Sequence, residues 1–247
     1  MSAKSHKLSA GPIGLIGFGA FGQLIAEHIH PRCPTIVFDL MPDVARAKEL
    51  GVDIVPFEVV ASCSIVVLAV PVSQMRVVVT DLTSFLKPGA LVIDVGSVKV
   101  EPAEIMGELL PKDVEVVATH PLFGPQSARN GILGQKIAIC PIRGRRLRVA
   151  AFCRMIGLDV ILTTPEEHDR QVAEVQGLTH LVASLVLKVN PQPTRMTTRS
   201  FELLMAAVDM VRHDAPEVLQ AILTTNPYAG HVLERFKSLT YALGESN

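Results

Sequence analysis

The sequence predicts an α/β domain built on a doubly wound parallel sheet, followed by a smaller all-helical domain. Between residues 13 and 162, short β-branched apolar runs alternate with segments that have helical periodicity. The runs are nearly continuous in hydrophobicity, which is typical of strands covered by helices on both faces. Alternation of such strands with helices predicts a doubly wound sheet. We expect strands at residues 13–16, 35–38, 65–70, 91–95, 114–118, 137–139 and 160–162.

The pattern changes after residue 164. Pro165 stands where the first turn of a helix accepts proline, and two glutamates follow it, where acidic side chains interact favourably with the helix dipole. One long helix is predicted to run to about Val189, where the segment Asn-Pro-Gln-Pro interrupts it. The rest of the chain has helical periodicity and no convincing strand. We therefore predict three parts: a flexible tail over residues 1–12, an α/β domain over residues 13–163 and a helical domain over residues 164–247.

Composition and charge exclude several classes of protein. Apolar residues make up 49% of the chain, yet its longest apolar run, residues 65–72, is far shorter than the roughly 20 residues that span a bilayer. The first twelve residues contain no apolar segment typical of a secretory signal. The net charge of -1 indicates no basic surface for nucleic acid. We therefore expect a cytoplasmic protein with no nucleic-acid partner and no membrane partner.

The four cysteines have no spacing that is typical of a metal site or a redox motif, and three of them adjoin apolar stretches. Cysteines of this kind are typically reduced, buried thiols. No pair of His, Asp or Glu residues with ligand spacing has a third partner nearby, so we expect no bound metal. The cysteines are Cys33, Cys63, Cys140 and Cys153.

A glycine-rich turn follows the first predicted strand and opens an apolar helical segment. It reads Gly17-Phe18-Gly19-Ala20-Phe21-Gly22. In such a GxGxxG turn the first glycine allows a tight bend, the second lets the backbone approach a pyrophosphate, and the third lets helix and strand pack closely. The helix N-terminus supplies unpaired N–H groups and the positive end of the helix dipole. The motif and its place predict a Rossmann-type dinucleotide-binding domain over residues 13–163.

Asp39 ends the second predicted strand. A carboxylate at this place accepts hydrogen bonds from both hydroxyls of the adenosine ribose and repels the 2'-phosphate of NADP. No arginine follows Asp39 to offset that repulsion, so NAD is predicted in preference to NADP. The alternative is that Asp39 only caps a helix that begins at Pro42. Val70 and Pro71 stand at the end of the third predicted strand, and we expect them beside the nicotinamide ribose.

Two further strand ends carry polar residues that apolar packing does not explain. Ser97 follows the strand at residues 91–95, and His120 follows the next strand along the chain. Both belong to the carboxyl edge of the sheet, where ligands of open α/β sheets bind. A histidine can take a proton near neutral pH, which oxidation of an alcohol by hydride transfer requires. The sequence therefore predicts a serine and an imidazole near the nicotinamide ring.

Taken together, the motifs resemble those of the prephenate and arogenate dehydrogenases of tyrosine biosynthesis. The resemblance covers residues 13 to about 236 and is closest to the short forms, including plant-type arogenate dehydrogenases. Its most specific part is the His-Pro-Leu-Phe-Gly-Pro stretch that begins at His120. It rests on the glycine turn, on Asp94-Val-Gly-Ser-Val-Lys, on Thr119-His-Pro-Leu-Phe-Gly-Pro, on Glu166-Glu-His-Asp-Arg and on Thr179-His180.

The resemblance implies an oxidative decarboxylation of a cyclohexadienol. Hydride leaves C4 for NAD, the C4 hydroxyl loses its proton, and CO2 leaves C1 as the ring becomes aromatic. The product is tyrosine from arogenate or 4-hydroxyphenylpyruvate from prephenate. By resemblance, His120 accepts the proton, Ser97 is its hydrogen-bonding neighbour, and His180 is a second substrate-cleft residue on the long helix. From the residues alone, the mixed helix face around His180 suits a cleft, and a structural histidine is the alternative.

The groups that bind the substrate side chains are less defined. Many members of the family have an arginine for the ring carboxylate at a place where this sequence has none. Arg212 lies close by, and Arg129, in the loop after the second polar strand end, is its rival; Gln126 in the same loop is a further candidate. Asp209 could pair with the ammonium group of arogenate, which favours arogenate over prephenate, unless Asp209 is a solvated helix residue.

Two alternative interpretations stay open. One is a β-hydroxyacid dehydrogenase or imine reductase of the same layout, although hydroxyacid enzymes usually use a lysine on the interdomain helix, where this chain has only Lys188 near the end. The other is an NAD-sensing module without turnover, which would have no use for Ser97, His120 and His180 together. In either case the helical domain is too small to bury all its apolar surface, so we expect a homodimer through the C-terminal helices.

Overall fold

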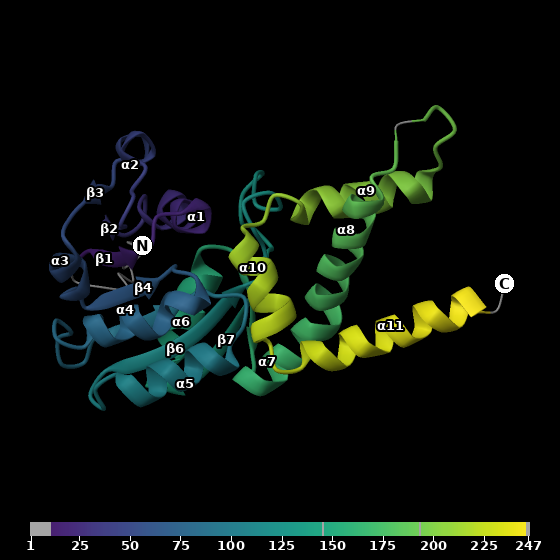
Figure 1. The fold of residues 1–247 in the computed structure, drawn as a ribbon. Coiled ribbons are helices and arrows are strands. Elements are labelled where there is room, and N and C mark those ends of the chain that lie inside the picture. The colour runs from purple at the N-terminus through teal and green to yellow at the C-terminus, as the bar shows by residue number, and fades with distance from the viewer. Residues whose placement is uncertain (1–10, 145, 193, 246–247) are drawn as a thin grey trace. The chain divides into compact units, whose positions relative to one another are not determined.

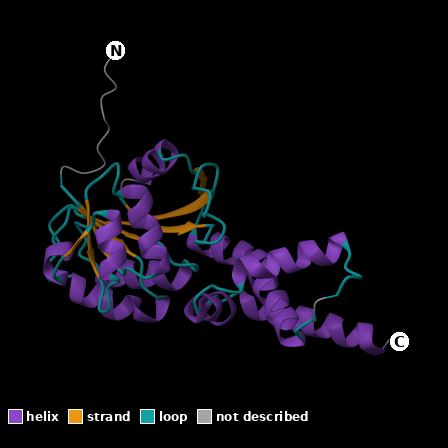
Figure 2. Cartoon of the chain, turned by 90° about the horizontal axis from the view of Figure 1, so that it is seen from above, coloured by secondary structure: helices purple, strands orange, loops and turns teal. Residues whose placement is uncertain are grey.

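The computed structural model describes residues 11–144, 146–192 and 194–245, and the chain divides into two compact units, Met1–Pro165 and Glu166–Asn247. The first unit is α/β and the second is helical, and Figure 2 shows the strands confined to the first. The predicted fold class is confirmed. Most of the flexible tail predicted over residues 1–12 lies outside the described residues.

One eight-stranded sheet forms the centre of the first unit, in the order β3-β2-β1-β4-β5-β6-β7-β8. All neighbouring strands are parallel except β6 and β7. The expectation of a fully parallel sheet is wrong at this pair, because the connection between β6 and β7 contains no crossover helix. The strands are β1 (Ile13–Ile16), β2 (Thr35–Phe38), β3 (Asp53–Ile54), β4 (Ile65–Leu68), β5 (Leu91–Asp94), β6 (Glu115–Pro121), β7 (Lys136–Arg143) and β8 (Asp159–Leu162).

Helices cover both faces of this sheet, as expected for strands without polar alternation (Figure 1). Side chains of α1, α2 and α6 form the core on one face, and side chains of α3, α4 and α5 form the core on the other. The helices are α1 (Ala20–Ile29), α2 (Val44–Leu50), α3 (Phe57–Ala61), α4 (Met75–Leu82), α5 (Val100–Leu109) and α6 (Arg146–Met155), and the short 3₁₀ helix η1 (Val72–Gln74) precedes α4.

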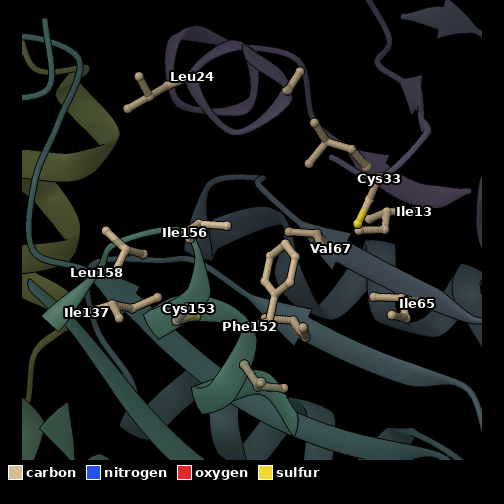
Figure 3. Packing of buried hydrophobic residues seen from close by; sticks show 14 of the residues in the cluster. Ile13, Leu24, Cys33, Ile65, Val67, Ile137, Phe152, Cys153, Ile156 and Leu158 are labelled. Carbon is tan, nitrogen blue, oxygen red and sulfur yellow. The ribbon is translucent and has the colours of Figure 1, made fainter. Parts of the chain in front are cut away.

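The core on the α1 face is apolar throughout. Figure 3 shows Phe152 of α6 close to Val67 of β4, and side chains of α1, α6 and the strands line a cavity of about 100 Å³. All four cysteines are buried and unbridged, which agrees with the expectation of reduced thiols. Burial raises the pKa of the Cys153 thiol to about 12, so this thiol stays protonated at neutral pH.

The turn between β1 and α1 depends on two of its three glycines. Gly17 has a φ of 98°, and a Cβ atom there would lie 2.3 Å from the carbonyl oxygen of Ala69. A Cβ atom at Gly22 would lie 2.1 Å from the carbonyl oxygen of Gly17. Gly19, in contrast, has a φ of -67° and open space where a Cβ would stand. Gly17 and Gly22 are therefore required by packing, whereas Gly19 is not.

The second unit begins with one long helix, Pro165–Val189, which contains a single π-helical segment. Asn226 fastens this helix to the C-terminal part of the unit, because its side-chain amide donates to the carbonyl oxygen of Asp169 at 2.8 Å. The elements are α7 (Pro165–Val172), η2 (Ala173–Gly177), α8 (Leu178–Val189), α9 (Arg199–Val211), α10 (Pro216–Gln220), η3 (Ala221–Thr225) and α11 (Ala229–Glu245).

By length and composition alone, the helix Pro165–Val189 could cross a membrane, and it is the one such helix in the described part of the chain. Polar residues divide it, so it contains no long uninterrupted apolar run. Its first turns hold the buried pair His168 and Asp169, whose side chains are 2.7 Å apart. Only 28% of its most apolar window is buried, so much of its apolar surface is available to a partner.

The glycine geometry predicts opposite results at two positions of the same turn. Gly22→Ala should lower the free energy of unfolding by about 3 kcal/mol, because the new methyl group overlaps a backbone carbonyl that cannot move freely. Gly19→Ala should change it by less than about 1 kcal/mol. Urea unfolding of both variants measures the difference, and equal stabilities would contradict the packing argument.

Candidate active site

The carboxyl ends of the central strands meet in one row. In-register pairing aligns the last residues of β2, β1, β4 and β5 with Ala118 of β6 across the sheet. Residues just beyond this row therefore emerge at the same edge. The predicted site residues that lie one to three positions beyond this row are Asp39, Gly17, Val70, Ser97 and His120.

Asp39 connects the end of β2 to the glycine turn. One of its carboxylate oxygens accepts the backbone N–H of Phe18 at 2.6 Å, and the other accepts the N–H of Met41 at 2.8 Å. Helix α2 is capped by the side chain of Asp43. The interpretation of Asp39 as the cap of that helix is therefore wrong, and Asp39 instead holds the glycine turn at Phe18.

The N-terminus of α1 has the features of an anion cradle. Its N-cap residue is Gly19, which offers no side-chain hydrogen bond to the first turn. Gly19 and Ala20 are exposed, so an incoming group can reach the N–H groups of this turn. Unpaired N–H groups and the helix dipole favour a phosphate at such a place. The residues present fit a dinucleotide pyrophosphate.

The chain that leaves β4 lies between the glycine turn and the loop that carries Ser97. A Cβ atom at Gly17 would lie 3.2 Å from Cγ1 of Val70, and one at Gly96 would lie 3.4 Å from Cγ2 of Val72. Pro71 is exposed between these two contacts. The predicted cofactor residues Val70 and Pro71 therefore lie between the glycine turn and the Ser97 loop.

A buried ion pair stands at the end of β5. The Lys99 ammonium group donates to the Asp94 carboxylate, and the two side chains are 0% and 1% exposed. Lys99 also donates to the carbonyl oxygen of Thr119 at 2.6 Å. Burial raises the pKa of the Asp94 carboxyl, while Lys99 and the N–H groups of Gly96 and Thr119 act to lower it. Sequence reasoning gave the pair no role, although a lysine flanked by apolar residues at a strand end is a signal for it.

His120 lies inside β6 rather than after it. The strand continues to Pro121 because it pairs with β7, where His120 stands opposite Ala138. His120 is buried, with 5% of its surface exposed. Phe123 follows shortly and packs against Phe21 of the glycine turn, with 6.2 Å between ring centroids. The strand that carries His120 therefore ends at the same edge of the sheet as the glycine turn.

The loop after β6 contains the predicted substrate residues Gln126 and Arg129. Both are exposed. Arg129 lines a cavity of about 380 Å³ together with Ala20 and Gln23 of α1, so it faces the helix that begins at the glycine turn. Gln126 does not line this cavity. The structure thus brings Arg129, but not Gln126, beside the first turn of the candidate cofactor helix.

In the helical unit, His180 is 6% exposed and its Nε2 atom is 3.7 Å from a carboxylate oxygen of Asp214. Burial lowers the pKa of His180 and raises the pKa of Asp214. One turn before His180, the side-chain oxygen of Gln176 is buried without a hydrogen-bond partner among the described residues. Sequence reasoning missed Asp214, because nothing in the sequence links positions so far apart.

The other two predicted residues of this unit form an ion pair with each other. Arg212 donates to the Asp209 carboxylate at 2.9 Å, one turn apart at the end of α9, and both are exposed. An exposed pair of this kind contributes little to stability. To bind Arg212 or Asp209, a substrate carboxylate or ammonium group would have to displace the other residue of the pair. The structure therefore gives less support to either residue as a substrate-binding group.

The sheet order, the glycine turn and the polar strand ends together define a Rossmann-type nucleotide-binding protein. The family described as "Prephenate dehydrogenase, nucleotide-binding domain" matches residues 28–151, and "Prephenate dehydrogenase, dimerization domain" matches residues 164–244. The chain belongs to the prephenate dehydrogenase family, and the resemblance identified from its motifs is confirmed.

Two relatives have related names. "Arogenate dehydrogenase 1, chloroplastic" of Arabidopsis thaliana is 29% identical over 244 residues, which are 91% of this chain and 37% of that protein. "Probable arogenate/prephenate dehydrogenase" of Methanocaldococcus jannaschii is 30% identical over 250 residues, which are 94% of this chain and 55% of that protein. The chain therefore spans about half or less of the length of these relatives.

Solved structures share the fold. Prephenate dehydrogenase from Aquifex aeolicus, in complex with hydroxyphenyl propionate and NAD+, superposes with a TM-score of 0.75 at 23% identity and covers 96% of this chain and 90% of that one. Synechocystis arogenate dehydrogenase gives a TM-score of 0.68 at 20% identity, with 95% and 90% coverage. The similarity to these two structures is a similarity of fold, and it extends over nearly the whole chain.

The environment of His180 predicts a pH dependence of stability. Because burial lowers its pKa in the folded chain, the unfolded chain takes up a proton first as the pH falls below about 6.5. The contribution of His180 to stability is therefore present above that pH and is lost below it. Between pH 7.5 and 5.5, the free energy of unfolding should fall more steeply in the parent than in His180→Asn, which retains the other titrating groups. Parallel curves in urea unfolding would contradict this.

Proposed function

We propose that this chain oxidises and decarboxylates a cyclohexadienol, arogenate or prephenate, with NAD as the hydride acceptor. The observation that carries the proposal is the row of strand ends, which sets Ser97 and His120 at the same sheet edge as the glycine turn. Membership of the prephenate dehydrogenase family supports the reaction type. The comparisons do not favour the two alternatives, a β-hydroxyacid dehydrogenase and an NAD sensor.

The cofactor site would consist of the glycine turn, Asp39 and the chain after β4. Backbone N–H groups at Gly19 and Ala20 would hold the pyrophosphate, and Asp39 would accept the hydroxyls of the adenosine ribose. Its negative charge favours NAD over NADP. Bound NAD supplies the hydride acceptor. The A. aeolicus structure with NAD+ supports the same use of the fold.

The chain's own contribution to the chemistry would be proton transfer and orientation. As hydride leaves C4, the C4 hydroxyl gives its proton to His120, and Ser97 holds that hydroxyl by a hydrogen bond. The C1–carboxylate bond then breaks, CO2 leaves, and its electron pair completes the aromatic ring. His120 can return the proton to the phenolate oxygen, so protons and electrons balance. Aromatisation drives this second half, and the protein mainly has to assist the first.

Acceptor groups around His180 favour the substrate that carries an ammonium group. The Asp214 carboxylate and the unsatisfied oxygen of Gln176 are both acceptors, and an alkylammonium group is a donor. Asp209, which was predicted for this role from the sequence, is already paired with Arg212. We therefore propose arogenate ahead of prephenate.

A single assay tests the activity. Purified protein is mixed with NAD or NADP and with arogenate, prephenate or a short β-hydroxyacid, and the absorbance of the reduced cofactor is followed. We expect the highest kcat/KM with arogenate and NAD. His120→Asn should lower kcat at least about 100-fold, because the proton acceptor is lost, with NAD affinity unchanged by calorimetry. No turnover by the parent would favour a sensor, and turnover of the hydroxyacid alone would favour the other rival.

We also propose that the helical unit forms a homodimer, which the match to a dimerization domain supports. Apolar side chains on its helices are exposed in the single chain, which is typical of an interface. They include Val175, Leu185, Val189, Leu203, Leu204 and Met210.

Light scattering after size exclusion should give a dimer. Leu203→Glu should shift the chain towards the monomer, because Leu203 is 54% exposed on α9 and a charge would be buried in the interface. The matched control is Leu147→Glu, which changes a similarly exposed leucine, 68%, on α6 of the other unit. A parent monomer, or equal effects of both variants, would contradict the proposed interface.

A further inference from the structure

The ion pair between Asp94 and Lys99 is more deeply buried than any other in the described part of the first unit, and the proposed reaction does not use it. Charges are rarely kept in a core for stability alone, since an apolar pair of similar volume often stabilises a protein as well or better. Both residues flank Ser97, and both contact Thr119, which precedes His120. The position of the pair therefore points to a role other than stability.

The Asp94–Lys99 pair connects β5 to β6 just beyond the last backbone pairing between these two strands. Regular pairing of β5 with β6 ends at Asp94 and Ala118. Beyond that row, the Asp94 carboxylate accepts the N–H of Thr119 at 3.3 Å, and Lys99 donates to the carbonyl oxygen of Thr119 at 2.6 Å. The Thr119 hydroxyl donates to the carbonyl oxygen of Asp94 at 2.7 Å. Side chains thus bind the donor and the acceptor of the residue before His120.

The opposite side of β6 is held by ordinary backbone pairing. Antiparallel β7 places Ile139 opposite Thr119 and Ala138 opposite His120. The segment that carries the imidazole is therefore fixed from both sides, by backbone on one and by the ion pair on the other. The same pair shapes the Ser97 loop, because the N–H of Gly96 donates to Asp94 at 3.0 Å and Lys99 closes the loop.

We propose that Asp94, Lys99 and Thr119 form a clamp that positions His120 and Ser97 relative to each other. None of the three is a catalytic residue, since each acts through the backbone of a neighbour. An apolar core could fill the same volume but could not bind the Thr119 peptide in one orientation. The inference rests on the proposed function, because positioning matters only if His120 and Ser97 act on one substrate.

The test compares three variants of the full chain. Lys99→Met removes the ammonium group at similar volume, Thr119→Val removes only the hydroxyl, and Val92→Ala truncates a buried β5 residue outside the clamp as a control. A displacement of about 1 Å can cost about 100-fold in rate, so we expect kcat to fall about 100-fold in Lys99→Met and about 10-fold in Thr119→Val. KM and the Kd for NAD should change less than about 3-fold, and Val92→Ala should retain the parent kcat.

A spectroscopic readout separates positioning from loss of stability. In protein labelled with ¹⁵N-histidine, the ring signals of His120, assigned through His120→Asn, should move in Lys99→Met and Thr119→Val and stay in place in Val92→Ala. Unchanged kcat and His120 signals in a folded Lys99→Met chain would overturn the clamp. So would an equal loss of kcat in the control.

Two further outcomes are also decisive. If Lys99→Met does not fold, Thr119→Val tests the clamp by the same two measurements, and unchanged kcat and ring signals in that variant would overturn it. If the parent turns over no cyclohexadienol, the proposed function fails, and the ring signals alone then decide whether the clamp fixes His120.

Discussion

Parallel pairing without stagger is the constraint on which the candidate site depends. Because β2, β1, β4 and β5 end in one row with Ala118 of β6, whatever follows each strand meets at one edge. A shift of a single strand by one residue would turn its side chains to the other face and separate the group. The apolar residues of these strands therefore determine where the polar site residues lie, although the apolar residues themselves are not part of the site.

Polar residues at or just beyond this row of strand ends hold the neighbouring turns, and some of them can also bind a ligand. Asp39 binds the backbone of the glycine turn at Phe18, and Asp94 binds the backbone of the Ser97 loop at Gly96. Such bonds fix turns that have no helix or sheet ladder of their own. A carboxylate has lone pairs to spare, so Asp39 can hold the Phe18 N–H and still accept the hydroxyls of a ribose. The same residue can thus contribute to structure and to binding.

The two histidines singled out by sequence have different surroundings. His120 is paired with β7 on one side and follows Thr119, which the Asp94–Lys99 pair holds on the other side, so its backbone has little freedom. His180 belongs to a helix just after a π-helical segment, beside the carboxylate of Asp214 and a buried amide oxygen. Segments of π-helix are frequent at functional sites, because the extra residue in the turn re-aims the side chains that follow. Under the proposed function, the first environment would serve proton transfer at a fixed point, and the second would serve recognition of a donor group.

The sequence by itself determined the fold class, the glycine turn and every strand of the sheet except the two-residue β3, because hydrophobic periodicity and GxGxxG spacing are local properties that each segment carries alone. It also predicted Ser97 and His120 near the carboxyl edge of the sheet, since every parallel strand ends at the same edge, although β6 extends past His120. Only the tertiary structure decided that β7 runs antiparallel, that Asp43 rather than Asp39 caps α2, that Asp209 pairs with Arg212, and that Asp214 approaches His180. Those features depend on which side chains meet in space, and residues such as Asp214 and His180 are brought together by helix packing that no local pattern encodes.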